Sequence, residues 1–263
     1  MLSQPEPLSP RNSRVKDLRD IARSRASRES EGVVLVEGAT LIAEALAAGW
    51  DVLEEFVGPG GEQVTAGVCT PLTAAALERV ATTTEPQPNL ALIARRQSKF
   101  TSDVRSVMVL DGLGDPGNVG TLIRSAEAAG LDAVICTPGT ADVFSPKTIR
   151  SSAGAVFHVP VIEMSLDDVA EVGFLLVATS SHRGTPYRSF DWSQKIAVVM
   201  GNEAHGVDED SKISEWVQIP QRGRSESLNV AMAGTLIAFA LAESVAGGGE
   251  TLARRATMPM LLR

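Results

Sequence analysis

Three short polar blocks, far apart in the chain, contain the residue types best suited to chemistry. They are NVGTLIR at 118–124, MGNE at 200–203, and a third block that joins IP at 219–220 to SLN at 227–229. Each block stands where a hydrophobic strand pattern ends. Because open α/β sheets bind ligands at the carboxyl ends of their strands, we expect the three blocks to meet in one crevice.

A glycine pattern ahead of the first block suggests a different chemistry. Residues 112–117 match G-x-G-x-x-G between an expected strand and an expected helix, which is the context of a dinucleotide-binding turn. The loop extends through Gly117, however, so that Asn118 is the expected helix cap. The next strand, 133–136, also lacks a terminal acid for a ribose, since Asp132 stands at its opposite end. We therefore interpret the glycines as a tight turn that lets backbone approach a ligand.

Length and composition narrow the class of protein. A chain of 263 residues predicts two domains, with one large domain as the alternative, and 44% hydrophobic with 21% charged residues is typical of a globular protein. No apolar run approaches the roughly 20 residues of a membrane span, and the first residues do not resemble a secretory signal. We expect a cytoplasmic protein. Cys69 and Cys136 have no second ligand nearby, so neither a disulfide framework nor a metal site is expected.

The charge distribution is uneven. Residues 11–28 contain seven basic side chains against Asp17 and Asp20, a local balance of +5 in a chain of net charge −8. A basic segment on an acidic protein can neutralise phosphates locally while the bulk charge discourages promiscuous association. The alternative is a solvated helix face, and charge alone does not decide between the two.

Element patterns place a boundary near residue 100. The first part alternates expected helices (15–27, 40–48, 73–79) with expected strands (33–36, 53–57, 90–94), and 95–103 reads as a linker. The second part has expected strands at 107–110, 133–136, 175–178, 196–200 and 217–219, with helical stretches between them. That rhythm predicts a parallel sheet with helices on both faces. The last helix, 229–245, is apolar on more than one side, which suits packing in a core or against a second subunit.

At these residues the chain resembles a known family. The three blocks, extended to 111–130, 198–207 and 219–231, are similar to the motifs of the SpoU-type (TrmH-like) branch of the SPOUT RNA methyltransferases. That branch includes ribosomal and transfer RNA ribose 2'-O-methyltransferases and the thiostrepton-resistance enzyme. Residues 145–155 are also similar. The resemblance is strong over about 105–245 and weaker at 34–38, which looks like part of the family's substrate-binding domain.

The resemblance implies an architecture. It implies an α/β fold in which a parallel sheet carries a carboxyl-terminal deep trefoil knot, preceded by a smaller α/β ribosomal-protein-like RNA-binding domain. The implied divisions are 1–100 for substrate RNA binding, 101–104 for a linker, 105–246 for the methyltransferase domain and 247–263 for a mobile tail. It also implies a homodimer formed through the knot region. Composition and periodicity could not have indicated a knot, which breaks the usual rule on threading.

The resemblance also implies ligand-binding residues. S-adenosylmethionine would be held by backbone around Gly201, Ile219 and Leu228, with Thr179 near it. Structured RNA, ribosomal RNA above all, would contact basic side chains, namely Arg14, Lys16, Arg19, Arg28 and Arg150. For Arg150 the alternative is an ordinary surface or helix-end arginine.

Methyl transfer to a ribose hydroxyl is an in-line displacement, so the protein must align the reacting atoms, remove a proton and exclude water. Family proposals make Arg124 the base, but an arginine is a poor proton acceptor, and we expect it to orient substrate and stabilise charge. The supporting catalytic residues would be Asn118, Glu203, Ser227 and Asn229. Each has a structural alternative, as a helix cap or, for Glu203, as a surface carboxylate. The three histidines are expected to be non-catalytic.

The expected function is therefore S-adenosylmethionine-dependent methylation of a ribose 2'-hydroxyl, on ribosomal RNA. Transfer RNA is the nearest alternative substrate, and a catalytically silent RNA-binding protein is the alternative of another class. The joint presence of Arg124 and Glu203 favours an enzyme.

Overall fold

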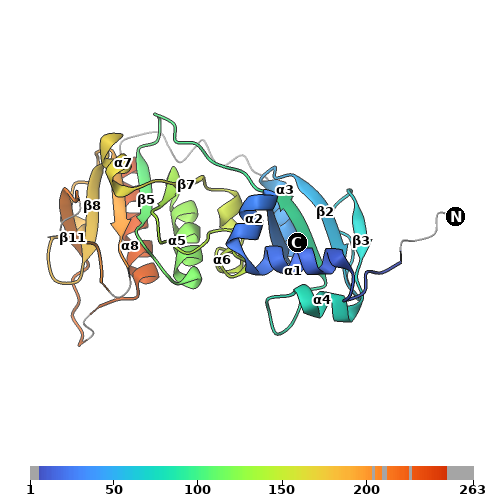
Figure 1. Ribbon diagram of the computed structural model, residues 1–263. Helices are drawn as coiled ribbons and strands as arrows, with labels where there is room; N and C mark the ends of the chain where they lie inside the picture. The colour runs from blue at the N-terminus through green and yellow to red at the C-terminus, as the bar shows by residue number, and fades with distance from the viewer. Residues whose placement is uncertain (1–5, 203–204, 209–211, 225–226, 248–263) are drawn as a thin grey trace. The chain divides into compact units, whose positions relative to one another are not determined.

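The chain divides into two units, and the computed structural model describes residues 6–202, 205–208, 212–224 and 227–247 (Figure 1). The first unit comprises the described residues up to Lys99 together with Asp115–Arg124 and Ala141–Pro160. The second comprises Phe100–Gly114, Ser125–Thr140 and the described residues from Val161 onward. The first boundary adjoins the one expected near residue 100, whereas two segments expected in the second domain pack with the first unit.

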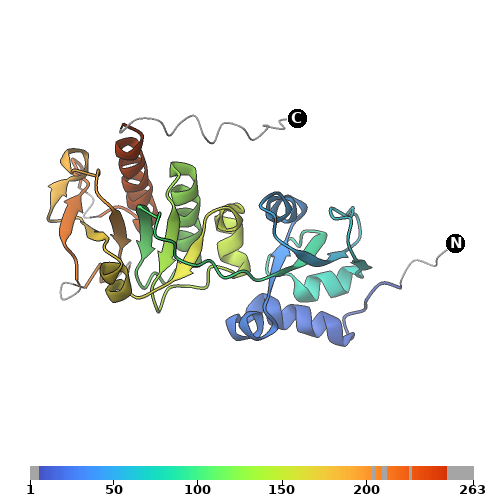
Figure 2. The same cartoon turned by 90° about the horizontal axis from the view of Figure 1, so that it is seen from above.

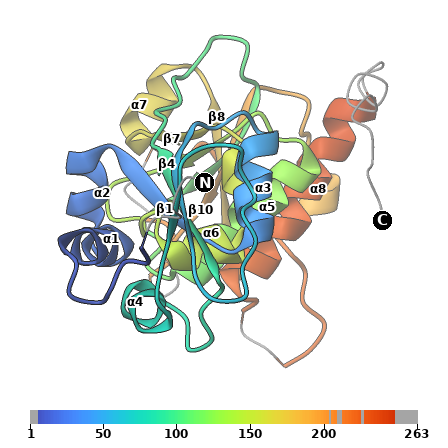
Figure 3. The same ribbon diagram turned by 90° about the vertical axis from the view of Figure 1, so that its right-hand side faces the viewer.

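The first unit is built on a four-stranded sheet of order β1-β4-β2-β3. Its strands are β1 (Val33–Glu37), β2 (Val52–Val57), β3 (Cys69–Pro71) and β4 (Asn89–Ala94). β4 pairs antiparallel with both β1 and β2, and only β2 and β3 are parallel. Figure 3 shows α1 (Ser13–Arg23) and α4 (Ala74–Val80) on one side of this sheet and α3 (Ala39–Ala47) on the other. The core of the unit lies between α1, α4 and the sheet, where Leu18, Phe56 and Leu90 are fully buried.

The basic helix expected over 15–27 is two helices. Ser24 has extended backbone, and its side chain accepts a hydrogen bond from the Ser27 amide, so α1 ends there and α2 (Arg25–Glu31) begins. A serine that satisfies an orphan amide at a helix start is a strong N-cap. The expectation of one continuous helix was wrong at this residue.

A buried carboxylate supports the loop between β2 and β3. Glu55 accepts hydrogen bonds from the amides of Val64 and Thr65 and from Asn89 Nδ2, at 2.9 to 3.0 Å. Burial opposes the charge of Glu55, but these donors outweigh it and hold its pKa below the ordinary value. The half-buried Cys69 thiol has a raised pKa, through burial first and then the nearby charges of Glu55 and Glu54. Cys69 and the buried Cys136 are both free thiols, as expected.

The second unit is built on a seven-stranded sheet of order β7-β6-β5-β10-β8-β11-β9 in which every pairing is parallel. Its strands are β5 (Ser106–Leu110), β6 (Ala133–Cys136), β7 (Val161–Glu163), β8 (Leu175–Ser180), β9 (Thr185–Pro186), β10 (Ile196–Met200) and β11 (Glu215–Gln218). The expected parallel sheet is confirmed, although the short β7 and β9 at its edges were not predicted.

Helices cover both faces of this parallel sheet (Figure 2). α7 (Leu166–Glu171) packs on one face, where its Val169 joins a core with Val107, Val109 and Leu176. α8 (Val230–Gly247) and the later part of α5 (Pro116–Ala129) lie on the other, tied by a 2.7 Å hydrogen bond between the Ser125 and Thr235 hydroxyls. The described part of the chain contains no helix long and apolar enough to cross a membrane. The expected mobile tail falls, from 248 on, outside the described residues.

Candidate active site

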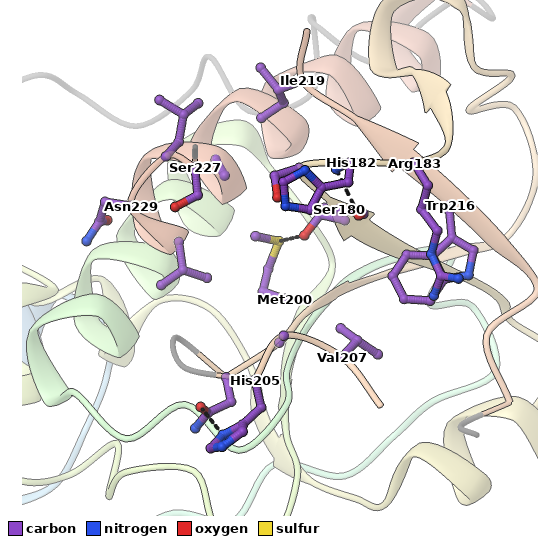
Figure 4. Close-up of a pocket in the computed structure, with 18 of the residues that line it drawn as sticks. Ser180, His182, Arg183, Met200, His205, Val207, Trp216, Ile219, Ser227 and Asn229 are labelled. Atoms are coloured by element: carbon purple, nitrogen blue, oxygen red, sulfur yellow. Dashed lines mark hydrogen bonds between the residues drawn. The ribbon is translucent and has the colours of Figure 1, made fainter. Parts of the chain in front are cut away.

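A cavity of about 600 Å³ opens at the carboxyl ends of β8 and β10 in the second unit (Figure 4). Its described lining comes from the ends of these two strands, from β11 and the residues after it, and from the start of α8. Six of the predicted site residues line it: Thr179, Gly201, Ile219, Ser227, Leu228 and Asn229. The second and third polar blocks therefore meet, and the roles assigned to their residues remain predictions.

Strand order explains why a cavity forms at this edge. β6 and β7 follow β5 on one side of the sheet. The later strands β10 and β8 lie on the other side of β5, with β10 next to it, so the strand order reverses at β5. Such a reversal leaves a crevice at the carboxyl ends of the central strands. Two hydrogen bonds join the ends of β5 and β10 here, from the Asp111 amide to the Met200 carbonyl (2.9 Å) and from Asn202 Nδ2 to the Gly112 carbonyl (2.8 Å).

Gly201 is required by the close approach of two backbone segments. A Cβ atom at this position would lie 2.5 Å from the Val207 amide nitrogen, closer than real Cβ contacts. Gly206 lies in the segment that turns back toward Gly201, and its positive φ of 71° would be strained in a residue with a side chain. Gly201 and Gly206 both line the cavity, where they contribute backbone and no side chain.

Several lining residues were not predicted from the sequence. The Arg183 guanidinium lies 3.8 Å from the ring centroid of Trp216, and both side chains line the cavity. His182 and His205 line it as well, the latter 3.4 Å from Asn202 Oδ1. Their position in the sequence could have indicated this, because His182 and Arg183 follow β8 at the same sheet edge as Thr179.

Asn229 caps α8. Its Oδ1 accepts hydrogen bonds from the amides of Ala231 (2.9 Å) and Met232 (3.3 Å), which satisfies two donors at the helix start. The structural alternative for this residue is confirmed. The cap also orients a segment that lines the cavity.

Asn118 does not cap α5, contrary to expectation. The helix begins at Pro116, a residue well suited to a first turn, and Asp115 Oδ2 accepts the Asn118 amide hydrogen bond at 3.0 Å. α5 therefore opens inside the glycine pattern rather than after it. A hydrogen bond from Lys147 Nζ (2.7 Å) holds the pKa of Asp115 below its ordinary value.

The first block is not part of the described cavity lining. Asn118 is half-buried and Arg124 is exposed on α5, and both belong to the segment grouped with the first unit. The Arg124 side chain makes no hydrogen bond or ion pair with a described residue. Glu203 lies outside the described residues.

The predicted RNA-binding residues differ in their surroundings. Lys16 is exposed and Arg19 half-buried, whereas the exposed Arg14 pairs with Glu54 and lies over the Phe56 ring. Arg150, one-third exposed, donates to the Thr82 hydroxyl at 2.8 Å. The surfaces of these four residues permit RNA contact to different degrees.

Arg28 is not an RNA-facing residue. It is 4% exposed, and its Nε and Nη2 donate to Asp142 Oδ2 at 2.9 and 2.5 Å. The prediction was wrong because the charge pattern gave no indication of a carboxylate that lies far along the chain.

Asp132 has a structural role that accounts for its place before β6. Its Oδ2 accepts hydrogen bonds from the amides of Arg105 and Ser106 and from the Ser106 hydroxyl, each at 2.9 Å.

In the described residues no group of three or more histidine, cysteine, aspartate or glutamate side chains could hold a metal ion.

Family models match most of the chain. Residues 105–239 match the SpoU rRNA Methylase family, and residues 12–91 match the MRM3-like substrate binding domain. Among relatives, the chain is 35% identical over 243 residues to the Bacillus subtilis 23S rRNA (guanosine(2553)-2'-O)-methyltransferase RlmP, covering 89% of this chain and 97% of that protein.

Solved structures show the same architecture. AviRb, a SpoU methyltransferase from Streptomyces viridochromogenes solved in complex with the cofactor AdoMet, superimposes with a TM-score of 0.78 at 25% identity, covering 90% of this chain and 100% of that one. An AdoMet-bound rRNA methyltransferase from Sinorhizobium meliloti gives 0.79 at 29% identity, covering 88% and 95%.

Proposed function

The chain belongs to the SpoU rRNA methylase family, and from this premise we propose that its second unit holds S-adenosylmethionine in the cavity at the carboxyl ends of β8 and β10. The protein is an S-adenosylmethionine-dependent RNA methyltransferase that modifies a ribose 2'-hydroxyl of ribosomal RNA. The observation that carries the cavity assignment is the meeting there of the second and third polar blocks.

The residues of the cavity fit the cofactor. A volume of about 600 Å³ is within the range of small-molecule sites, and Gly201 and Gly206 add backbone groups to its lining. Backbone at Ile219 and Leu228 and the Thr179 hydroxyl provide hydrogen-bonding groups around it. When bound, S-adenosylmethionine supplies a methyl group on a sulfonium whose positive charge is lost on transfer.

Arg124 acts on the substrate rather than on the cofactor. An exposed guanidinium can hold a phosphate by two parallel hydrogen bonds and can stabilise the charge that develops on the ribose oxygen. Because a guanidinium offers hydrogen-bond donors and no acceptor, Arg124 orients the RNA and does not accept the hydroxyl proton. Asn118, Glu203, Ser227 and Asn229 position the reacting groups.

The knot and the dimer are the finer parts of the proposal. β10 is inserted between β5 and β8, and the residues after β11 return to line the cavity that the β10 loop also lines, a path that suits a trefoil knot. α8 exposes Met232 (65%), Leu236 (42%) and Phe239 (45%). These side chains support a homodimer in which the α8 helices of two subunits pack together.

Ribosomal RNA contacts the first unit. The match to a substrate-binding domain covers α1, whose exposed Lys16 and half-buried Arg19 lie near Arg14. Arg14 and Arg150 complete this surface through the parts of their side chains that remain accessible. Work on ribosomal RNA agrees with a cytoplasmic location.

Two measurements test the function. Calorimetric titration with S-adenosylhomocysteine should give a saturable heat, and no heat at millimolar ligand would remove the cofactor assignment. Arg124→Ala should lower methyl incorporation into a 23S rRNA transcript by at least about a hundredfold while the affinity for S-adenosylhomocysteine stays within about twofold. Retained methyl transfer would take Arg124 out of the reaction.

A further inference from the structure

A buried ion pair joins the substrate-binding residues to a segment of the methylase match. Arg28, in α2, pairs with Asp142 through two nitrogens, and its Nη1 donates to the Ile21 and Ala22 carbonyls at the end of α1. The other carboxylate oxygen, Asp142 Oδ1, accepts the Phe144 amide at 2.9 Å. The side chains are 5% and 14% exposed, so the charges are compensated away from water, where geometry counts most.

Two further contacts hold the same segment, residues 141–160. Trp50 Nε1 donates to the Phe157 carbonyl at 2.9 Å, and Arg150 Nη1 donates to the Thr82 hydroxyl at 2.8 Å. The segment contains α6 (Pro146–Ser151; Figure 1), and α6 contacts β1. These contacts lie within the first unit, which groups 141–160 with the substrate-binding residues.

α6 in turn fixes the first turns of α5. A Cβ on Gly120 would lie 2.5 Å from the Thr148 carbonyl oxygen, so the two helices touch at backbone distance. The Ser151 hydroxyl donates to the Pro116 carbonyl at 3.0 Å, and Lys147 pairs with Asp115, the α5 cap, at 2.7 Å. Little freedom is left between α6 and the start of α5.

Arg124 lies one turn beyond Gly120 on the same side of α5 and in the same unit. We propose that Arg28 is a positioning residue: through Asp142 and α6 it holds Arg124 in a fixed place relative to the surface that binds the RNA. This inference rests on the proposed role of Arg124. It gives Arg28 a part in the reaction although the residue touches neither RNA nor cofactor.

The effect on rate follows from alignment. A displacement of about 1 Å at the reacting group can lower a rate by up to about a hundredfold, even when the substituted residue is remote. Arg28→Ala leaves Asp142 buried without its partner, so α6 should shift or loosen, and Arg124 with it. Binding of RNA along α1 and of cofactor in the second unit should persist.

The test separates positioning from general stability. Arg28→Ala and Arg28→Lys are compared with Glu55→Gln, which weakens another buried carboxylate network of the same unit without touching 141–160. Single-turnover methyl transfer to a 23S rRNA transcript is measured at saturating RNA and cofactor, with separate dissociation constants for RNA and S-adenosylhomocysteine. Arg28→Ala should lower the rate constant by about tenfold to a hundredfold, Arg28→Lys less, and both dissociation constants should stay within about twofold.

Three results would overturn the proposal. One is an unchanged rate constant at saturating RNA, another is a loss confined to RNA affinity, and the third is an equal rate loss in Glu55→Gln. Arg28→Lys serves alone if Arg28→Ala does not fold.

Hydrogen exchange provides a readout that does not depend on activity. Relative to Glu55→Gln, the Arg28 variants should exchange faster at the amides of α6 and the first turns of α5, and unchanged exchange there refutes the coupling. If the unaltered protein transfers no methyl group, the proposed function fails, and this exchange comparison still decides whether Arg28 holds α5.

Discussion

The two units offer different chemical groups to the ligands proposed for them. The described lining of the cavity in the second unit contains one arginine, two histidines and no carboxylate, and Gly201 and Gly206 line it with backbone alone. The first unit instead gathers arginines and lysine along α1 and α2, and it pairs three of them, Arg14, Arg25 and Arg28, with acids. A small cofactor is selected by shape and backbone groups, whereas RNA is attracted by charge that salt weakens.

The comparison also shows that a count of basic residues overestimates how many of them are available to bind RNA. Arg28 is buried against Asp142, and Arg14 and Arg150 each have partners within the unit. Arginine makes bidentate contacts with carboxylates as readily as with phosphates, so part of a basic cluster serves folding.

The largest effect on cofactor binding alone is expected from a side chain at Gly201, which lines the cavity and packs against the Gly206–Val207 backbone. Gly201→Val should reduce affinity for S-adenosylhomocysteine by about a hundredfold or more, because its Cβ would collide with the Val207 amide and shift the backbone. RNA affinity should be unchanged. Calorimetry measures the first and filter binding the second.

Gly223→Ala is the matched control, since no atom lies within 4 Å of a Cβ at that position. If it weakens cofactor binding as much as Gly201→Val, the loss does not come from the close approach at Gly201.

A smaller effect is expected from charge removal on α1. The double variant Lys16→Ala, Arg19→Ala should weaken RNA binding and reduce the slope of log affinity against log salt by about one for each phosphate that the protein no longer neutralises. Cofactor affinity should not change. Lys212→Ala, an exposed lysine of the second unit paired with Asp167, is the control. An unchanged salt slope in the double variant would show that α1 is a solvated helix face that does not bind RNA.

The smallest effect concerns stability rather than ligands. Because the folded-state pKa of Glu55 is below its ordinary value of 4.5, its charged form stabilises the fold above that pH, and the contribution is lost as pH falls through the folded-state pKa. Glu55→Gln should therefore lower the free energy of unfolding by about 2 kcal/mol at pH 7, and by less in acid. Denaturant titration at pH 7 and pH 4 measures both. A pH-independent difference would show that the amide donors do not act on the charge.

The longer strands could be predicted from the sequence, whereas very short strands and contacts between distant residues could not. Buried runs such as 107–110 and 196–200 predicted the parallel sheet correctly, because strands covered on both faces are continuously apolar. β3, β7 and β9 are only two or three residues long and owe their pairing to neighbours, so no local pattern marks them.

The same limit applies to the site. Two polar blocks were placed correctly at one cavity because strand ends in a parallel sheet share an edge. The stacking of Arg183 on Trp216, and the pairing of Arg28 with Asp142, join residues far apart in the chain. The start of α5 was misplaced because glycines suggested a loop, whereas Asp115 and Pro116 together begin a helix there.

The state of the two thiols has a practical consequence for spectroscopy. Only thiolates react rapidly with maleimides, and Cys136 is buried while the pKa of half-buried Cys69 is raised, so both should label slowly near neutral pH. A cysteine introduced at an exposed position would then take up a fluorophore selectively without removal of the native pair. The protein can in this way carry a single dye on either unit.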